Sequence, residues 1–149
     1  MQAMKPLRVS ILFLLLSTGL SSGAQYQTKD RTIPCKTETV APACYWTHGR
    51  LAFGNGTPAL RLWKIGSKRI LGIYSGPSTY DPQSDDPDND DNEGPQLPLN
   101  VVQAMWRFKT QGLPRRIFAD FEVCPLEPER PGAMQAACVQ SAKNIVIEK

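Results

Sequence analysis

The segment from Cys44 to Tyr74 carries the strongest β-strand signal in the chain. Three runs of mainly aromatic, β-branched and other apolar residues follow one another in it: 45–53, 59–65 and 69–74. Such runs favour strands. The turn signals Gly54-Asn55-Gly56 and Gly66-Ser67-Lys68 separate them, because Asn and Gly adopt positive φ at low cost. The segment therefore predicts a three-stranded antiparallel meander at the centre of the fold.

Alternation within these strands assigns side chains to two faces. In the second strand, Leu60, Leu62 and Lys64 share one face, and Arg61 and Trp63 lie on the other. In the third strand, Gly72 lacks a side chain to pack, which predicts a bulge or a close approach of another segment.

The first 24 residues have the layout of a secretory signal peptide. Lys5 and Arg8 precede an apolar run from Val9 to Leu16, and small residues lead to Ala24. This run is shorter than the ~20 residues that a membrane span needs, which disfavours a membrane anchor. No other segment is apolar enough to span a bilayer. We expect cleavage near Ala24, a secreted or periplasmic location, and one exported β-rich domain over 25–149.

Four cysteines in an exported chain predict two disulfides, formed by Cys35, Cys44, Cys124 and Cys138. The sequence allows three pairings. The local pattern, Cys35–Cys44 with Cys124–Cys138, is weakly favoured. Pairing Cys44 with Cys124 or Cys138 would instead tie the meander to the C-terminal strands. A zinc site is disfavoured because there is no CxxC pair and only one histidine. We expect no cofactor.

Residues 75–98 form a break rich in proline and acidic residues, which we expect to be a mobile loop. Its seven acids are Asp81, Asp85, Asp86, Asp88, Asp90, Asp91 and Glu93. An EF-hand frame starting at Asp86 fails, because Asp91 stands where glycine is needed and Leu97 where glutamate is needed. A weak calcium site on Asp86, Asp88 and Asp90 is the alternative to a solvated acidic loop.

The C-terminal half predicts one helix and further strands. Residues 99–110 favour a short helix with Asn100 as its N-cap, although a strand remains an alternative for the second half. Residues 115–124 alternate as a strand. Residues 134–141 and 145–148 favour a hairpin that turns at Lys143-Asn144, with a helix over 133–143 as the alternative. With about six strands and at most one short helix, the chain predicts a mainly β fold, a small antiparallel β-sandwich or barrel.

A cluster of polar and aromatic residues on the meander is the best candidate for a ligand site: His48, Arg50, Arg61 and Trp63. If Arg69 joins them on one face, arginine beside tryptophan can stack on rings and hold anionic groups. Alternatively, these arginines pair with the acidic loop or only solvate an outer face. Most aromatic residues are expected in the core: Trp46, Phe53, Trp63, Trp106, Phe108, Phe118 and Phe121.

The favoured function is a non-enzymatic binding or envelope-associated module with an unspecified ligand. No catalytic residue is assigned, since the GxSxG motif is absent and all cysteines are expected to be oxidised. A secreted hydrolase that uses His48 with Asp120 or Glu122 is the main alternative, and a calcium-responsive module is the third. Formal charge is +3, and loss of Lys5 and Arg8 leaves about +1, so no attraction to nucleic acid is expected.

Overall fold

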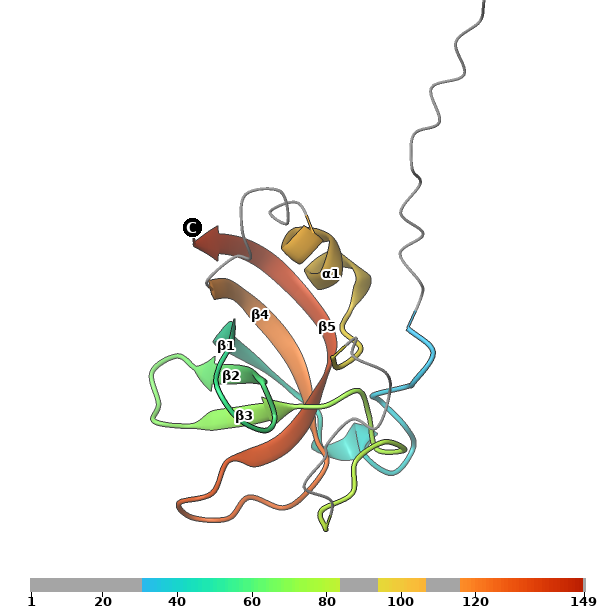
Figure 1. Cartoon of the computed structure of the whole chain (residues 1–149). Coiled ribbons are helices and arrows are strands. Elements are labelled where there is room, and N and C mark those ends of the chain that lie inside the picture. Colours follow the sequence, from blue (N-terminus) through green and yellow to red (C-terminus); the bar gives the residue numbers. More distant parts are fainter. Residues whose placement is uncertain (1–30, 84–93, 107–115, 149) are drawn as a thin grey trace, which may run out of the picture.

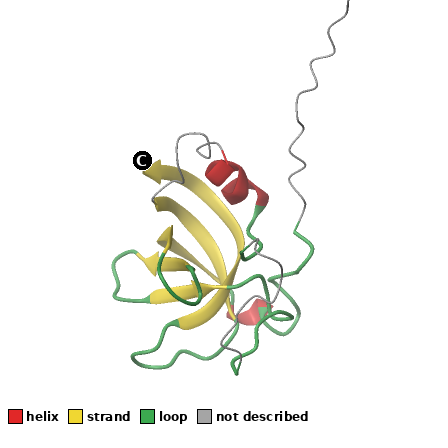
Figure 2. Cartoon of the chain, viewed as in Figure 1, coloured by secondary structure: helices red, strands yellow, loops and turns green. Residues whose placement is uncertain are grey.

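The computed structural model describes residues 31–83, 94–106 and 116–148 (Figures 1 and 2). These residues contain five strands, one α-helix and one 3₁₀ helix. In chain order the elements are η1 (Ala41–Ala43), β1 (Tyr45–Phe53), β2 (Leu60–Lys64), β3 (Ile70–Ile73), α1 (Leu99–Trp106), β4 (Arg116–Pro125) and β5 (Gln135–Glu148). The predicted signal peptide, 1–24, and six of the seven acids of the predicted acidic loop lie outside the described residues.

The five strands close into a barrel in the order β1-β2-β3-β5-β4. β1 pairs antiparallel with β2 on one edge and with β4 on the other. β4 and β5 are also antiparallel, whereas β3 and β5 run parallel, and α1 lies in the crossover between β3 and β4. β5 therefore lies between β3 and β4 in the closed order. The predicted fold class, a small mainly β barrel or sandwich with at most one short helix, is confirmed. The described residues form five strands where about six were expected, and the parallel pairing of β3 with β5 departs from the expected antiparallel arrangement.

The core fills the inside of the barrel with alternate residues of every strand. Its fully buried members include Leu51, Leu62, Ile73, Phe121, Val123 and Val139. The helix adds Val101 to the same cluster. The alternation predicted for the meander is confirmed, because Leu60 and Leu62 point inward while Arg61 and Trp63 are only partly buried. No helix among the described residues is long and apolar enough to cross a membrane.

Gly72 marks the close approach that its position in the third strand predicts. A Cβ atom at Gly72 would lie 2.7 Å from Cγ of Pro58. Real Cβ atoms do not approach carbon atoms this closely, so a side chain at this position would displace the β1–β2 connection.

The predicted C-terminal hairpin is wrong, and so is its helical alternative. Residues Gln135–Glu148 form one strand, β5, which pairs with β4 over nearly its whole length. Asn144 has a positive φ of 55°, and the register between β4 and β5 shifts beside it, between Phe118 and Asp120. Asparagine tolerates this conformation in a turn and in a bulge alike. The residue that signals a hairpin turn therefore makes a bulge in one continuous strand.

All four cysteines form disulfides, as predicted, but the local pairing is wrong. The bonds are Cys35–Cys138 and Cys44–Cys124. Cys124 and Cys138 face each other across β4 and β5, and each is bonded to a cysteine of the N-terminal segment. Cys35, Cys124 and Cys138 are fully buried in a second apolar cluster, on the side of β4 opposite to Val123.

The N-terminal arm, residues 31–44, is held against the barrel by polar contacts as well as by disulfides. The Arg31 guanidinium donates hydrogen bonds to the carbonyl oxygens of Val139, Ser75 and Ile33. Burial lowers the pKa of Arg31 to about 10. The amide of Lys36 donates to Oε1 of Gln140 over 3.0 Å. The arm is thus part of the folded domain.

The helix begins at Leu99, the first residue of the predicted range, but the predicted N-cap is wrong. α1 starts at Leu99, so Asn100 lies within its first turn and is not the N-cap. Nδ2 of Asn100 instead donates to the carbonyl oxygen of Ala142, 2.6 Å away, and this bond joins α1 to β5. Residues 107–115, which include the end of the predicted helix, lie outside the described part of the chain.

Candidate functional site

The predicted ligand-site residues lie on the outside of the barrel, on a surface that we call the β1 face. It comprises Trp46, His48 and Arg50 of β1, Trp63 of β2, Phe118, Asp120 and Glu122 of β4, and Lys143 of β5. Strand register places Arg50 opposite both Trp63 and Phe118. It places His48 opposite Asp120, and Trp46 opposite Glu122. Three of the four predicted residues, His48, Arg50 and Trp63, therefore share one surface with residues of β4.

Arg50 is a cation without a carboxylate partner among the described residues. Its guanidinium carbon lies 4.7 Å from the centre of the Trp63 ring. Its Nε is buried and makes no hydrogen bond within the described structure. A buried donor without an acceptor costs roughly 1–3 kcal/mol, so this arrangement is held by the surrounding packing. The face therefore presents a positive charge that no carboxylate of the described residues neutralises.

Trp46 and Lys143 repeat this arrangement on the other side of the face. Nζ of Lys143 lies 4.3 Å from the centre of the Trp46 ring. Trp46 is 48% exposed, and no carboxylate pairs with Lys143 within the described residues. Trp46 was expected in the core with the other aromatic residues, and this expectation is wrong for Trp46 and for Phe53, which is 49% exposed. It is also wrong for Trp63 and Phe118, which lie partly buried on the outside of the barrel. An exposed indole beside an unpaired cation is thus part of the site.

His48 and Asp120 form a hydrogen-bonded pair near the middle of the face. Nδ1 of His48 lies 2.9 Å from Oδ1 of Asp120, and Nδ2 of Asn144 donates to Oδ2 over 2.6 Å. The hydrogen bonds from Asn144 and then His48 lower the pKa of Asp120 below its usual range. Asp120 is therefore a charged acceptor at neutral pH. The Asn144 of the β5 bulge contributes directly to this site.

Glu122 does not contact His48. Its Oε1 pairs with Nζ of Lys36 at 2.7 Å, and its Oε2 accepts a hydrogen bond of 2.7 Å from the Ser141 hydroxyl. These contacts, Lys36 first and then Ser141, lower the pKa of Glu122. Of the two carboxylates that the sequence offered to His48, the structure brings only Asp120 to it.

Arg61 shares the outer side of β2 with Trp63 but serves the neighbouring turn. Its Nη2 donates to the carbonyl oxygen of Asn55 over 2.6 Å, and its Nε donates to that of Pro58 over 3.2 Å. Two of its donors are used to hold the β1–β2 connection in place. Arg61 thus shapes the border of the β1 face and has less capacity than Arg50 to bind a ligand.

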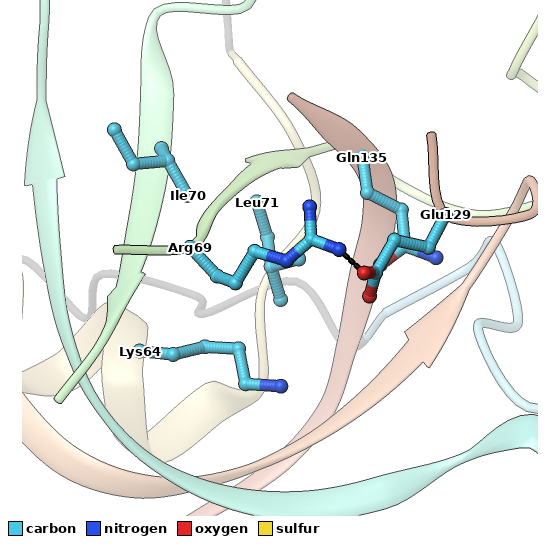
Figure 3. Close-up of a pocket in the computed structure, with 6 residues that line it drawn as sticks. All are labelled: Lys64, Arg69, Ile70, Leu71, Glu129 and Gln135. Carbon is cyan, nitrogen blue, oxygen red and sulfur yellow. Dashed lines mark ion pairs between the residues drawn. The ribbon is translucent and has the colours of Figure 1, made fainter. Parts of the chain in front are cut away.

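Arg69 does not join the face. It points to the opposite side of β3, where it pairs with Glu129 beside Lys64 and Gln135 (Figure 3). The predicted grouping of Arg69 with Arg50 and Arg61 is therefore wrong. The β3 residue that follows Arg69, Ile70, is the one opposite Trp63.

The described surface offers no deep pocket. The hollow shown in Figure 3 is a shallow surface depression with a cavity volume of about 0 Å³. A second, apolar hollow between β1, β2 and Met105 of α1 has a cavity volume of about 10 Å³. Small-molecule sites commonly have about 300–1,000 Å³. Any ligand of the β1 face therefore lies on an open surface.

No metal-ligand cluster and no nucleophile bonded to the His48 imidazole occur among the described residues. They contain no cluster of three or more His, Cys, Asp or Glu side chains that could hold a metal ion. Of their side chains, only that of Asp120 hydrogen-bonds to the imidazole of His48. The calcium candidates Asp86, Asp88 and Asp90 lie outside the described residues.

Sequence reasoning missed four residues of the site: Trp46, Phe118, Lys143 and Asn144. Trp46 was recoverable, because it precedes His48 and Arg50 at the same two-residue spacing and so lies on their face. Lys143 was not recoverable, since it was assigned to a turn. Comparison of the chain with protein-family models, with curated proteins and with solved structures found no significant match.

Proposed function

We propose that this protein is an exported, non-enzymatic binding module whose ligand lies on the β1 face. The observation that carries the proposal is Arg50, which is stacked on Trp63 and has no carboxylate partner among the described residues. Arginine and tryptophan are the residues most enriched where binding energy is concentrated. The two disulfides are compatible with the oxidising compartment that the signal-peptide pattern predicts.

The shape of the surface supports an extended ligand. The β1 face crosses four neighbouring strands, β2-β1-β4-β5, and the hollows elsewhere on the described surface are shallow. OB-fold domains are also five-stranded barrels, and they bind extended chains across their strands. This likeness concerns architecture alone, so it adds weight only together with the side chains on the face.

The test is to map binding by NMR on the ¹⁵N-labelled exported protein. A panel of oligosaccharides, peptides and cell-envelope fragments is titrated, and amide shifts are followed residue by residue. We expect at least one ligand class to shift amides of β1, β2 and β4 around Arg50 and to lose affinity in Arg50→Ala. Saturable binding that maps only to another surface would refute the proposed site, as would the absence of binding across the panel.

A secreted hydrolase is the second candidate, and the hydrogen bond between His48 and Asp120 favours it. A carboxylate that orients an imidazole is the usual support of a general base. Here the base would activate water, since no hydroxyl or thiol of the described residues contacts it. Turnover on ester, peptide or glycoside substrates that disappears in both His48→Ala and Asp120→Asn would establish this activity and displace the binding-module proposal.

A further inference from the structure

We propose that the ligand of the β1 face is a polysaccharide chain that carries carboxylate groups, a polyuronate. This inference rests on the proposed function, since it names the class of ligand for the same surface. It is drawn from the charges of the face, their spacing and the hydrogen-bond acceptors that lie between them.

The described charged groups of the face carry a small positive excess. Lys36 neutralises Glu122, whereas Arg50 and Lys143 together outweigh the single negative charge of Asp120. Arg50 and Lys143 are each held over an indole ring, 4.7 and 4.3 Å from the ring centres, and neither has a carboxylate partner among the described residues. Stacking fixes their positions before a ligand arrives, which reduces the entropy lost on binding. Both carboxylates of the face, in contrast, already accept two hydrogen bonds from neighbours. The charge left for a partner is therefore complementary to an anion.

The two cations are too far apart for one small anion. Arg50 is opposite Phe118, and Lys143 is opposite Asp120, two residues further along β4. Neighbouring strands lie about 4.8 Å apart and two residues span about 6.6 Å, so the two Cα atoms are about 12 Å apart. A chain with repeated anionic groups can reach both cations, whereas a single carboxylate cannot.

The groups between the cations favour a sugar chain over a simple polyanion. Asp120 lies between them and is charged, so it repels a ligand that carries only negative groups but accepts hydrogen bonds from hydroxyl groups. The exposed Trp46 offers an apolar surface to the C–H groups of a sugar ring. The planar fork of Arg50 matches a carboxylate. A uronic acid supplies hydroxyl groups, an apolar ring face and a carboxylate in one unit.

The closing experiment compares two polymers that differ only in charge. Isothermal titration calorimetry measures binding of the exported protein to polygalacturonate oligomers and to the same oligomers after methyl esterification. We expect binding to the acid form and at least 10-fold weaker binding to the ester. Arg50→Gln and Lys143→Gln should each weaken binding to the acid form about 10-fold. Arg130→Gln, the matched control, removes a positive charge from the β4–β5 loop and should leave affinity unchanged.

The remaining outcomes separate this inference from the proposed function. Equal binding of the acid and the ester, mapped by NMR to the β1 face, would overturn the carboxylate requirement and leave the binding module intact. Equal weakening by all three variants, with dextran sulfate bound as tightly as polygalacturonate, would indicate unspecific attraction of polyanions and overturn the inference. Absence of binding to both polymers, while another ligand of the panel shifts the face, would overturn the inference alone. Circular dichroism and urea midpoints confirm that each variant is folded.

Discussion

The two disulfides should be strongly non-additive in their effect on stability. They close long loops when each is considered alone, because the bonded cysteines are separated by 103 residues in one case and 80 in the other. In the chain-entropy model, a loop of about 100 residues is worth about 4.7 kcal/mol. With one disulfide already formed, however, the other closes only a short loop. This loop consists of residues 35–44, residues 124–138 and the bond already present, about 23 residues in all. Closing it is worth about 3.4 kcal/mol.

The perturbation is therefore a set of three variants in which the cysteines of one pair, of the other pair, or of both become alanine. We expect each single removal to cost about 3.4 kcal/mol and the double removal about 8 kcal/mol. The double loss exceeds the sum of the singles by about 1.3 kcal/mol, well above the ~0.5 kcal/mol within which independent effects add. Lost packing of the buried sulfur atoms raises all three values.

The assay is equilibrium unfolding in urea, followed by tryptophan fluorescence, with every form measured in the same concentration of trimethylamine N-oxide. The osmolyte strengthens burial and keeps the double variant folded at the start of the titration. Wild-type protein reduced with dithiothreitol is the control that removes both bonds without removing sulfur atoms. A double loss equal to the sum of the two single losses would refute the nested-loop reasoning.

Three further predictions concern the barrel and its outer face. Gly49→Ala should destabilise the fold by about 1–3 kcal/mol in urea unfolding, because the new Cβ would lie 2.6 Å from Cδ1 of Leu62; an unchanged midpoint would contradict this packing. Arg61→Ala should speed amide hydrogen exchange in the β1–β2 turn at least several-fold while exchange in β4 stays unchanged, because two bonds to turn carbonyls are lost. The pKa values of Asp120 and Glu122 are lowered in the folded protein. Their charged forms therefore stabilise the fold fully above the ordinary carboxyl pKa, near pH 4, and this stabilisation is lost as pH falls through the lower pKa values of the folded state. Asp120→Asn combined with Glu122→Gln should therefore flatten the decline of the urea midpoint between about pH 4.5 and 2, and an unaltered slope would show that these two groups do not cause it.

The meander was predictable because its signals are local. The turns at 54–56 and 66–68 lie between runs whose alternation is unambiguous, and the observed strands differ from the predicted ones by one residue at several ends. The neighbours Arg50 and Trp63 follow from the same local pairing. This part of the site was therefore accessible from sequence.

The C-terminal half was less predictable because long-range pairing decides it. Asn144 carries a turn signal, yet β4 runs alongside the whole of β5 and converts the turn into a bulge. The place of Lys143 on the β1 face depends on that bulge. The disulfide pattern depends on the alignment of Cys124 with Cys138 and on the path of the N-terminal arm, neither of which has a local signature. Short loops favour pairing of nearby cysteines in an unfolded chain. In the folded protein the arm instead brings Cys35 to Cys138 and Cys44 to Cys124.

The position of β1 in the closed barrel has a consequence for how the protein reaches its folded state. β1 pairs with β2, which follows it directly, and also with β4, which begins more than sixty residues after β1 ends. A chain that emerges from a membrane channel N-terminus first would expose one unpaired edge of β1, with Trp46 and Leu51, until nearly the whole sequence has crossed. Unpaired strand edges promote association with other chains. A chain with this topology that is exported, as we propose for this protein, would gain from a companion that shields this edge during export. Folding in vitro should be slow and sensitive to protein concentration.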